Sequence, residues 1–125
     1  MRFVLAVLMV MHGVAHLPGF VGSWQLAPLP GTPYRTTVLA GRLDVGDAGI
    51  RVIGALWLLA AVGFWIAALG AFTGRPWWMP VAMGVALVSL VLTVLGWPSS
   101  RIGVVVNLAI LAVLVLGERV GARLT

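Results

Sequence analysis

Residues 50–72 read IRVIGALWLLAAVGFWIAALGAF, and the only charged residue among them is Arg51, near the start. A helix needs about 20 predominantly apolar residues to cross the hydrocarbon core of a bilayer. This run therefore predicts a transmembrane α-helix. Trp57 and Trp65 lie inside it, at a depth where each indole N–H needs a hydrogen-bond partner.

Three more apolar runs share this character. Hydrophobic residues make up 62% of the chain and charged residues only 9%, a balance that soluble domains do not have. The sequence predicts an all-α membrane protein in which residues 1–125 form one bundle of four transmembrane helices. Residues 20–23 are a poor cleavage site, so we expect the first run to be a helix and not a secretory signal. The expected helices cover about residues 3–21, 50–72, 77–97 and 101–118.

A long connection at residues 22–49 separates the first two helices, and its apolar anchors and prolines predict a partly structured interfacial loop. Thr32 followed by Pro33 resembles an N-cap and first-turn pair. The pair predicts a short helix over about residues 33–43 at the membrane surface. Asp47 is expected to cap the second transmembrane helix.

All eight basic residues are arginine, and most lie at predicted membrane boundaries. Phosphate head groups there explain the net charge of +5, so the expected partners are membrane lipids and not nucleic acid. Four spans divide the arginines equally between the two sides of the membrane. The two sets are Arg2, Arg75, Arg119 and Arg123 against Arg35, Arg42, Arg51 and Arg101. The second set is spread through the longer loop, which favours cytoplasmic termini.

Two histidines lie one helical turn apart inside the first run, where a bilayer makes ionisable groups costly. At 1.5 Å of rise per residue, His16 lies about 8 Å below the outer end of its helix, and Asn107 lies at a similar depth in the fourth helix. The shared depth predicts a hydrogen bond between His16 and Asn107 within a polar cluster. The candidate pocket residues are His12, His16, Trp57, Ser89, Thr93 and Asn107.

Pro18 cannot donate a backbone hydrogen bond, so the first helix is expected to kink or end just after His16. A helix interrupted there could line a cavity, or it could simply terminate early at the membrane interface. Arg51 and Arg101 start helices where the macrodipole disfavours positive charge. Asp47 can pair with Arg51 along the helix. A charged rim above the histidines follows, formed by Asp44, Asp47, Arg51 and Arg101.

Several interpretations of the histidines stay open. They can be neutral interhelical hydrogen-bonding groups, or they can hydrogen-bond or exchange protons with a quinone or a polar lipid head group. A zinc site normally requires a third protein ligand, whereas Cu(I) could be bound by Met9, His12 and His16. The chain contains no cysteine, which excludes thiolate sites.

Residues 12–20 (HGVAHLPGF), residues 54–59 (GALWLL), Ser89, and the series of Trp97, Arg101, Gly103 and Asn107 suggest a family. Together they resemble small uncharacterised bacterial DoxX-like four-helix membrane proteins, which carry an HGxxHLxGF pattern in the first helix. The resemblance implies a four-helix bundle in the bacterial cytoplasmic (inner) membrane with both termini inside. It implies no established activity.

We therefore expect an accessory or lipid- or small-molecule-binding protein with a small polar pocket in the outer half of the bundle. The expected partners are an amphiphilic or isoprenoid ligand, a second copy of the chain or a membrane partner protein. No cofactor is predicted. The alternatives are a quinone-linked redox or proton-transfer enzyme component and a copper site, so the sequence leaves open whether the protein is an enzyme.

Overall fold

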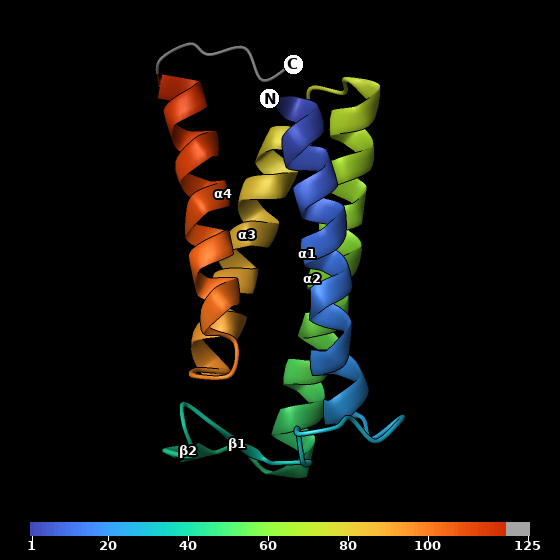
Figure 1. Cartoon of the computed structure of the whole chain (residues 1–125), viewed down its shortest axis with the longest axis vertical. Helices are drawn as coiled ribbons and strands as arrows, with labels where there is room; N and C mark the ends of the chain where they lie inside the picture. The colour runs from blue at the N-terminus through green and yellow to red at the C-terminus, as the bar shows by residue number, and fades with distance from the viewer. Residues whose placement is uncertain (120–125) are drawn as a thin grey trace.

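The computed structural model describes residues 1–119 and contains four helices and one small hairpin (Figure 1). The helices are α1 (Arg2–Ser23), α2 (Gly46–Thr73), α3 (Trp78–Leu95) and α4 (Arg101–Arg119), and the strands are β1 (Thr37–Val38) and β2 (Leu43–Asp44). The all-α four-helix bundle is confirmed. Arg123, which enters the count of arginines on each side, lies outside the described residues.

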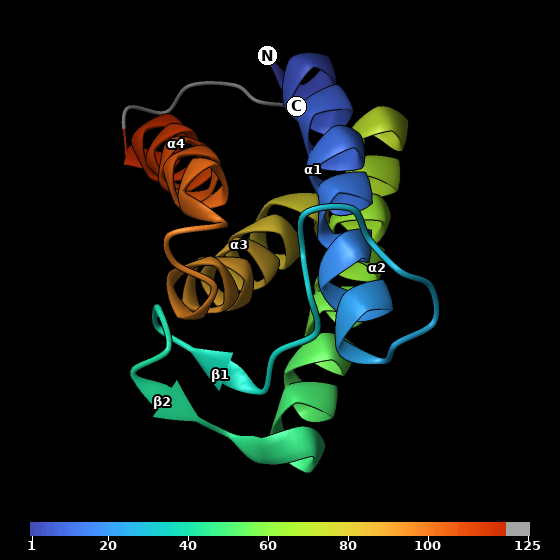
Figure 2. The same ribbon diagram turned by 60° about the horizontal axis from the view of Figure 1, so that its bottom comes forward.

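The helices run up and down in sequence order. α1 packs along α2, α2 packs against α3 and α3 against α4, whereas α1 and α4 meet at few points. Figures 1 and 2 show the start of α1 and the end of α4 at one end of the bundle, and the hairpin at the other. The hairpin end corresponds to the outer side of the sequence prediction, and we call it the outer end.

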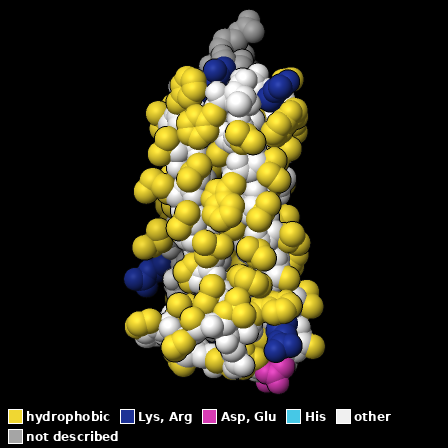
Figure 3. All heavy atoms as spheres, turned by 90° about the vertical axis from the view of Figure 1, so that its right-hand side faces the viewer, with side chains coloured by type: hydrophobic (Ala, Val, Ile, Leu, Met, Phe, Trp, Pro, Cys, Tyr) yellow, Lys and Arg dark blue, Asp and Glu magenta, His cyan; other side chains and the backbone are white. Residues whose placement is uncertain are grey.

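The surface of the bundle is suited to lipid. α1, α2 and α3 are long and apolar enough to cross a membrane, and α4 carries a shorter apolar stretch over Arg101–Gly117. Large apolar side chains such as Leu59, Val91 and Ile102 are more than half exposed. Figure 3 shows apolar side chains over the middle of one face, with the arginines nearer its two ends. The chain is therefore a multi-pass membrane protein.

The inner half of the bundle is packed through small residues. Alanines of α2 and α3 and glycines at the contacts let the backbones approach closely, which is how membrane helices gain van der Waals contact. Trp78 is fully buried in this core. The core residues are Leu5, Ala6, Met9, Phe64, Ala67, Ala68, Ala71, Trp78, Ala82, Ala86, Ile110 and Leu114.

The prediction of a short helix over residues 33–43 is wrong, because this segment forms the β1–β2 hairpin. Leu39, Ala40 and Gly41 have φ values of 54°, 58° and 83°, which turn the chain between the strands. The N–H of Leu39 donates to the carbonyl of Leu95 at 2.7 Å, and the N–H of Ala40 donates to that of Trp97 at 3.0 Å. These bonds connect the hairpin to the end of α3. They use N–H groups that a helix over residues 33–43 would need for its own backbone hydrogen bonds.

The ends of α1 and α2 differ in part from the sequence prediction. α1 does not end after His16 but continues through Pro18 to Ser23. Asp47 does not cap α2: its carboxylate accepts from the Tyr34 hydroxyl at 2.5 Å and so raises the pKa of Tyr34. The group next to the first helical N–H is Asp44, which accepts from the N–H of Gly46 at 3.0 Å and from a threonine hydroxyl. These bonds lower the pKa of Asp44.

The close approach of α2 to the start of α3 depends on Gly70. A Cβ atom there would lie 2.7 Å from the ring of Trp77 and 2.8 Å from Cβ of Trp78, whereas one at Gly84 would meet nothing within 4 Å. We predict that Gly70→Ala destabilises the protein by about 1–3 kcal/mol through overpacking. Gly84→Ala, the control, should be neutral or slightly stabilising. Thermal unfolding in detergent tests this, and equal midpoints for the two variants would contradict it.

Candidate functional site

A polar cluster lies between α1, α3 and α4 in the outer half of the bundle, and all of its side chains are at least nine-tenths buried. Nε2 of His12 lies 3.0 Å from Oδ1 of Asn107, and Nε2 of His16 lies 2.5 Å from the hydroxyl of Ser89. The amide nitrogen of Asn107 donates to Ser89 at 2.9 Å and to Thr93 at 3.3 Å. Three helices are thus joined by one hydrogen-bonded network.

The pairing inside the network differs from the sequence prediction. His16 and Asn107 do not bond directly. His12 is hydrogen-bonded to the side-chain carbonyl of Asn107, and His16 is hydrogen-bonded to Ser89. Ser89 connects the two branches, since its oxygen contacts both His16 and Asn107. The bonding partner of Asn107 is the histidine one turn deeper, and depth along a helix does not say which way a side chain points around it.

The proton on His16 can be assigned from a backbone group. Its Nδ1 lies 2.6 Å from the carbonyl oxygen of His12, and a carbonyl oxygen can only accept. Nδ1 therefore carries the proton, and Nε2 is an acceptor. The hydroxyl of Ser89 must donate to this Nε2, so its single proton is committed.

The orientation of Asn107 follows from the same reasoning. The hydroxyl of Thr93 donates to the backbone carbonyls of Ser89 and Leu90, both at 3.0 Å, so the Thr93 proton is committed as well. Ser89 and Thr93 can then only accept, and the group that faces them must be the NH₂ of Asn107. Its carbonyl faces His12, so we assign the proton of His12 to Nε2.

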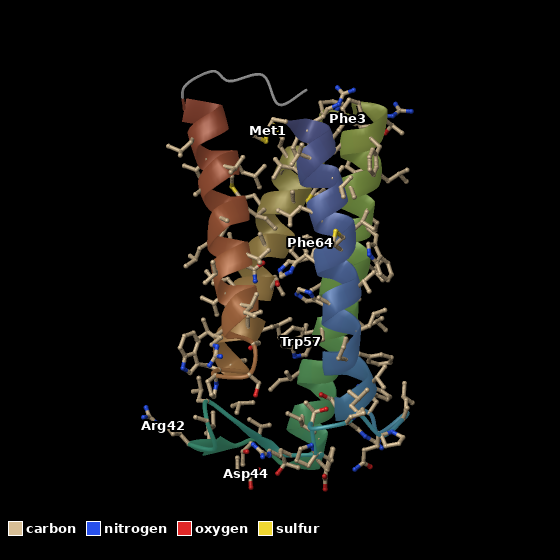
Figure 4. The ribbon with its side chains drawn as sticks, viewed as in Figure 1. Met1, Phe3, Arg42, Asp44, Trp57 and Phe64 are labelled. Carbon is tan, nitrogen blue, oxygen red and sulfur yellow. The ribbon has the colours of Figure 1, made fainter. Side chains whose placement is uncertain are left out.

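Aromatic rings of α2 contact both histidines. The ring centroid of Phe64 lies 5.0 Å from that of His12 and 5.4 Å from that of His16, and Trp57 lies 5.0 Å from His16 (Figure 4). α2 thus supplies ring contacts and not a hydrogen bond. The sequence prediction included Trp57 and missed Phe64, which is seven residues away and therefore on the same helix face. Trp65 instead donates to the carbonyl of Val10 at 3.2 Å.

A cavity of about 370 Å³ opens between α1 and α4 beside the histidines, and we call it the α1–α4 cavity. Met11 and Ile102 are 66% and 74% exposed and form its outer edges, so the opening faces the lipid side of the bundle. Its lining residues are Leu8, Met11, His12, Ala15, His16, Trp57, Thr93, Ser99, Ser100, Ile102, Gly103 and Val106. The sequence prediction contains four of these.

A second cavity of about 330 Å³ lies beneath the loop and the hairpin, and we call it the vestibule. It shares Ala15, Trp57, Ser99 and Ser100 with the α1–α4 cavity, so the two spaces adjoin at these residues. Trp57 packs over Gly19, where a Cβ would lie 2.6 Å from the indole. The indole therefore stands between the outer surface and the histidines.

The four predicted rim residues do not gather around the α1–α4 cavity. Asp47 and Arg51 line a surface pocket at the outer end with Trp24 and Tyr34. The predicted Asp47–Arg51 pairing is replaced by other contacts: Asp47 accepts from Tyr34, and the Arg51 guanidinium lies 5.5 Å over the Trp24 ring. Asp44 belongs to the hairpin, and Arg101 is the exposed first residue of α4. Neither lines the α1–α4 cavity, the vestibule or this surface pocket.

The donor atoms of His12, His16 and Met9 do not suit a metal ion. Both Nε2 atoms face hydrogen-bond partners and Nδ1 of His16 faces a carbonyl, so only Nδ1 of His12 is left as a ring nitrogen without a partner within the described residues. Met9 is fully buried in the apolar core. Within the described residues there is also no group of three His, Asp or Glu side chains that could hold an ion. The copper interpretation therefore has no support in the geometry.

Comparison of the chain with protein-family models, with curated proteins and with solved structures finds no match. The resemblance to DoxX-like proteins stays a prediction. The function must be argued from the chemistry of the α1–α4 cavity and its polar wall.

The bond between His12 and Asn107 should be visible as an energetic coupling. In a double-mutant cycle with His12→Ala and Asn107→Ala, we predict a coupling of about 0.5–1.5 kcal/mol in the free energy of unfolding in bicelles. The control cycle pairs Asn107→Ala with Thr73→Ala, because the Thr73 hydroxyl bonds only to carbonyls of its own helix. That cycle should be additive. Additivity in both cycles would show that the network does not hold α1 to α4.

Proposed function

We propose that the protein binds a small amphiphile from the membrane, with the polar head in the α1–α4 cavity and the apolar tail toward lipid. The observation that carries this proposal is the cavity itself, whose deep wall holds the polar network and whose edges are exposed apolar side chains. Its volume of about 370 Å³ is within the range of small-molecule pockets.

The lining divides into two chemistries that match the two ends of an amphiphile. His12 and Ser100 provide polar atoms on its walls, whereas Leu8 and Val106 provide apolar surface toward the lipid side. A tail leaving through this opening would stay in an apolar environment and lose no hydrogen bonds. The cavity thus suits a molecule that already resides in the bilayer, such as a lipid or an isoprenoid.

The geometry favours binding over the alternative of proton transfer in a quinone-linked enzyme. A proton relay needs groups that both accept and release protons along a path that continues to water. The network instead ends where Nδ1–H of His16 donates to the carbonyl of His12, and a backbone carbonyl passes no proton on. The hydrogen bonds therefore orient the histidines and do not form a conducting chain.

The proposal includes a location. In the bacterial cytoplasmic membrane, with both termini inside, the histidines and both cavities would lie in the outer half of the bilayer. A ligand would then reach the site from the outer leaflet. The hairpin and the vestibule would lie at the outer surface, where a second copy or a membrane partner could meet the bundle.

Filling the α1–α4 cavity should remove the ligand without disturbing the fold. Ala15 lines both cavities, whereas its neighbour Val14 is 53% exposed and lines neither. We predict that a defined amphiphile co-purifies with the wild type and the Val14→Phe variant, and that its amount falls at least several-fold in Ala15→Phe. Mass spectrometry of organic extracts measures it. Equal amounts in both variants would mean that the molecule is ordinary surface lipid.

A further inference from the structure

We infer that the α1–α4 cavity selects a head group that donates a hydrogen bond, that is, a hydroxyl-bearing amphiphile such as a phenol, a hydroquinone or a long-chain alcohol, and that Nδ1 of His12 accepts this bond. The inference rests on the proposed function and specifies the class of ligand. It follows from counting the protons of the polar network.

The first step concerns the tautomer of His12. Because Nε2 of His12 faces the carbonyl oxygen of Asn107 at 3.0 Å, the proton of the neutral ring is on Nε2. Nδ1 then carries a lone pair and no proton. Within the described part of the chain, no protein group donates to this Nδ1, although every other side-chain nitrogen and oxygen of the network has a partner.

The second step concerns the environment of that nitrogen. His12 lines the α1–α4 cavity and is only 7% exposed. Among the described residues, Nδ1 of His12 is not one of the fully enclosed nitrogens without a partner, which are Nε of Arg2 and Nε1 of Trp78, so this atom is open to the cavity. An acceptor without a partner is costly at a depth where the surrounding medium is hydrocarbon. A hydroxyl head group would satisfy it, whereas a carbonyl or ether oxygen would bring a second lone pair against the first. The site therefore discriminates between donors and pure acceptors.

The third step shows that the His12 tautomer is held in place. To present N–H at Nδ1, the ring would need a donor at Nε2, which requires Asn107 to reverse its amide. The carbonyl of Asn107 would then face Ser89 and Thr93, whose protons are committed to His16 and to backbone carbonyls. Reversal would put oxygen against oxygen at both contacts, so the network resists it.

Another group of the cavity has the same preference. The hydroxyl of Ser100 donates to the carbonyl of Thr93 at 2.5 Å, so its oxygen offers only lone pairs to a ligand. His16 offers nothing, since both of its ring nitrogens are bonded within the protein. Ser99 is exposed at the outer edge and can act as donor or acceptor there. The deep part of the cavity is thus a set of acceptors.

A pair of matched molecules tests the inference. 4-Octylphenol and 4-octylanisole differ in one hydroxyl proton, which the anisole replaces with a methyl group. We expect the wild-type protein in detergent to bind the phenol about threefold to tenfold more tightly than the anisole, the value of one added hydrogen bond. Thermal shift titrations give the two affinities. In His12→Phe the preference should disappear, while Val14→Phe should keep it.

Nitrogen NMR provides a readout that does not depend on a variant that folds. The chain has two histidines, so ¹⁵N-histidine labelling yields one Nδ1–H ring, His16, and one Nε2–H ring, His12. On addition of the phenol, the unprotonated nitrogen of His12 should move upfield because it accepts a hydrogen bond, and the anisole should leave it in place. An Nδ1–H tautomer at His12 would overturn the inference.

The outcomes separate this inference from the proposed function. If phenol and anisole bind equally and Ala15→Phe abolishes both, the cavity binds amphiphiles but does not require a donor. If neither binds while a co-purified amphiphile is lost in Ala15→Phe, the donor inference fails and the proposed function stands. If no amphiphile co-purifies and neither molecule binds, both fail.

Discussion

The hydrogen bond from Nδ1–H of His16 to the carbonyl of His12 determines the arrangement of the whole polar cluster. A carbonyl can only accept, so this 2.6 Å contact fixes one ring, and the fixed ring then commits the proton of Ser89. Ser89 in turn orients Asn107, and Asn107 orients His12. In a bilayer no water can replace a missing partner, so each step has one satisfactory solution.

Pro18 and Gly19 explain how a helix can carry such a cluster. The freed backbone groups around a proline are tolerated in membrane helices where neighbouring groups satisfy them. α1 continues to Ser23, whose hydroxyl donates to the carbonyl of Gly19 at 2.6 Å. Gly19 also lets the Trp57 ring lie against α1, and this places the indole 5.0 Å from His16. One local sequence feature thus builds both the helix and the wall between the two cavities.

The sequence predicts the features that depend on hydropathy and depth. The bilayer requires continuous apolar helices, so the run at residues 50–72 locates α2, and counting rise places His16 level with Asn107. What depends on rotation about a helix axis could not be predicted, including the pairing of His12 with Asn107. The sequence does not predict the hairpin for another reason. Its turn donates hydrogen bonds to the carbonyls of Leu95 and Trp97, and local propensity carries no information about partners so distant in the sequence.

The contrast between the two halves of the bundle bears on whether the histidines act only as interhelical glue. Histidines that only hold helices together would favour close contact between α1 and α4, as α2 and α3 have around Gly70. In the outer half the α1–α4 cavity lies beside the 3.0 Å bond between His12 and Asn107. At Gly103 a Cβ would lie 3.9 Å from the His12 ring and 2.6 Å from Thr93, so this glycine keeps space beside His12. A bundle that holds its polar wall rigid and leaves the adjacent space open is built as a binding site requires, with the cost of orienting the histidines met before a ligand arrives.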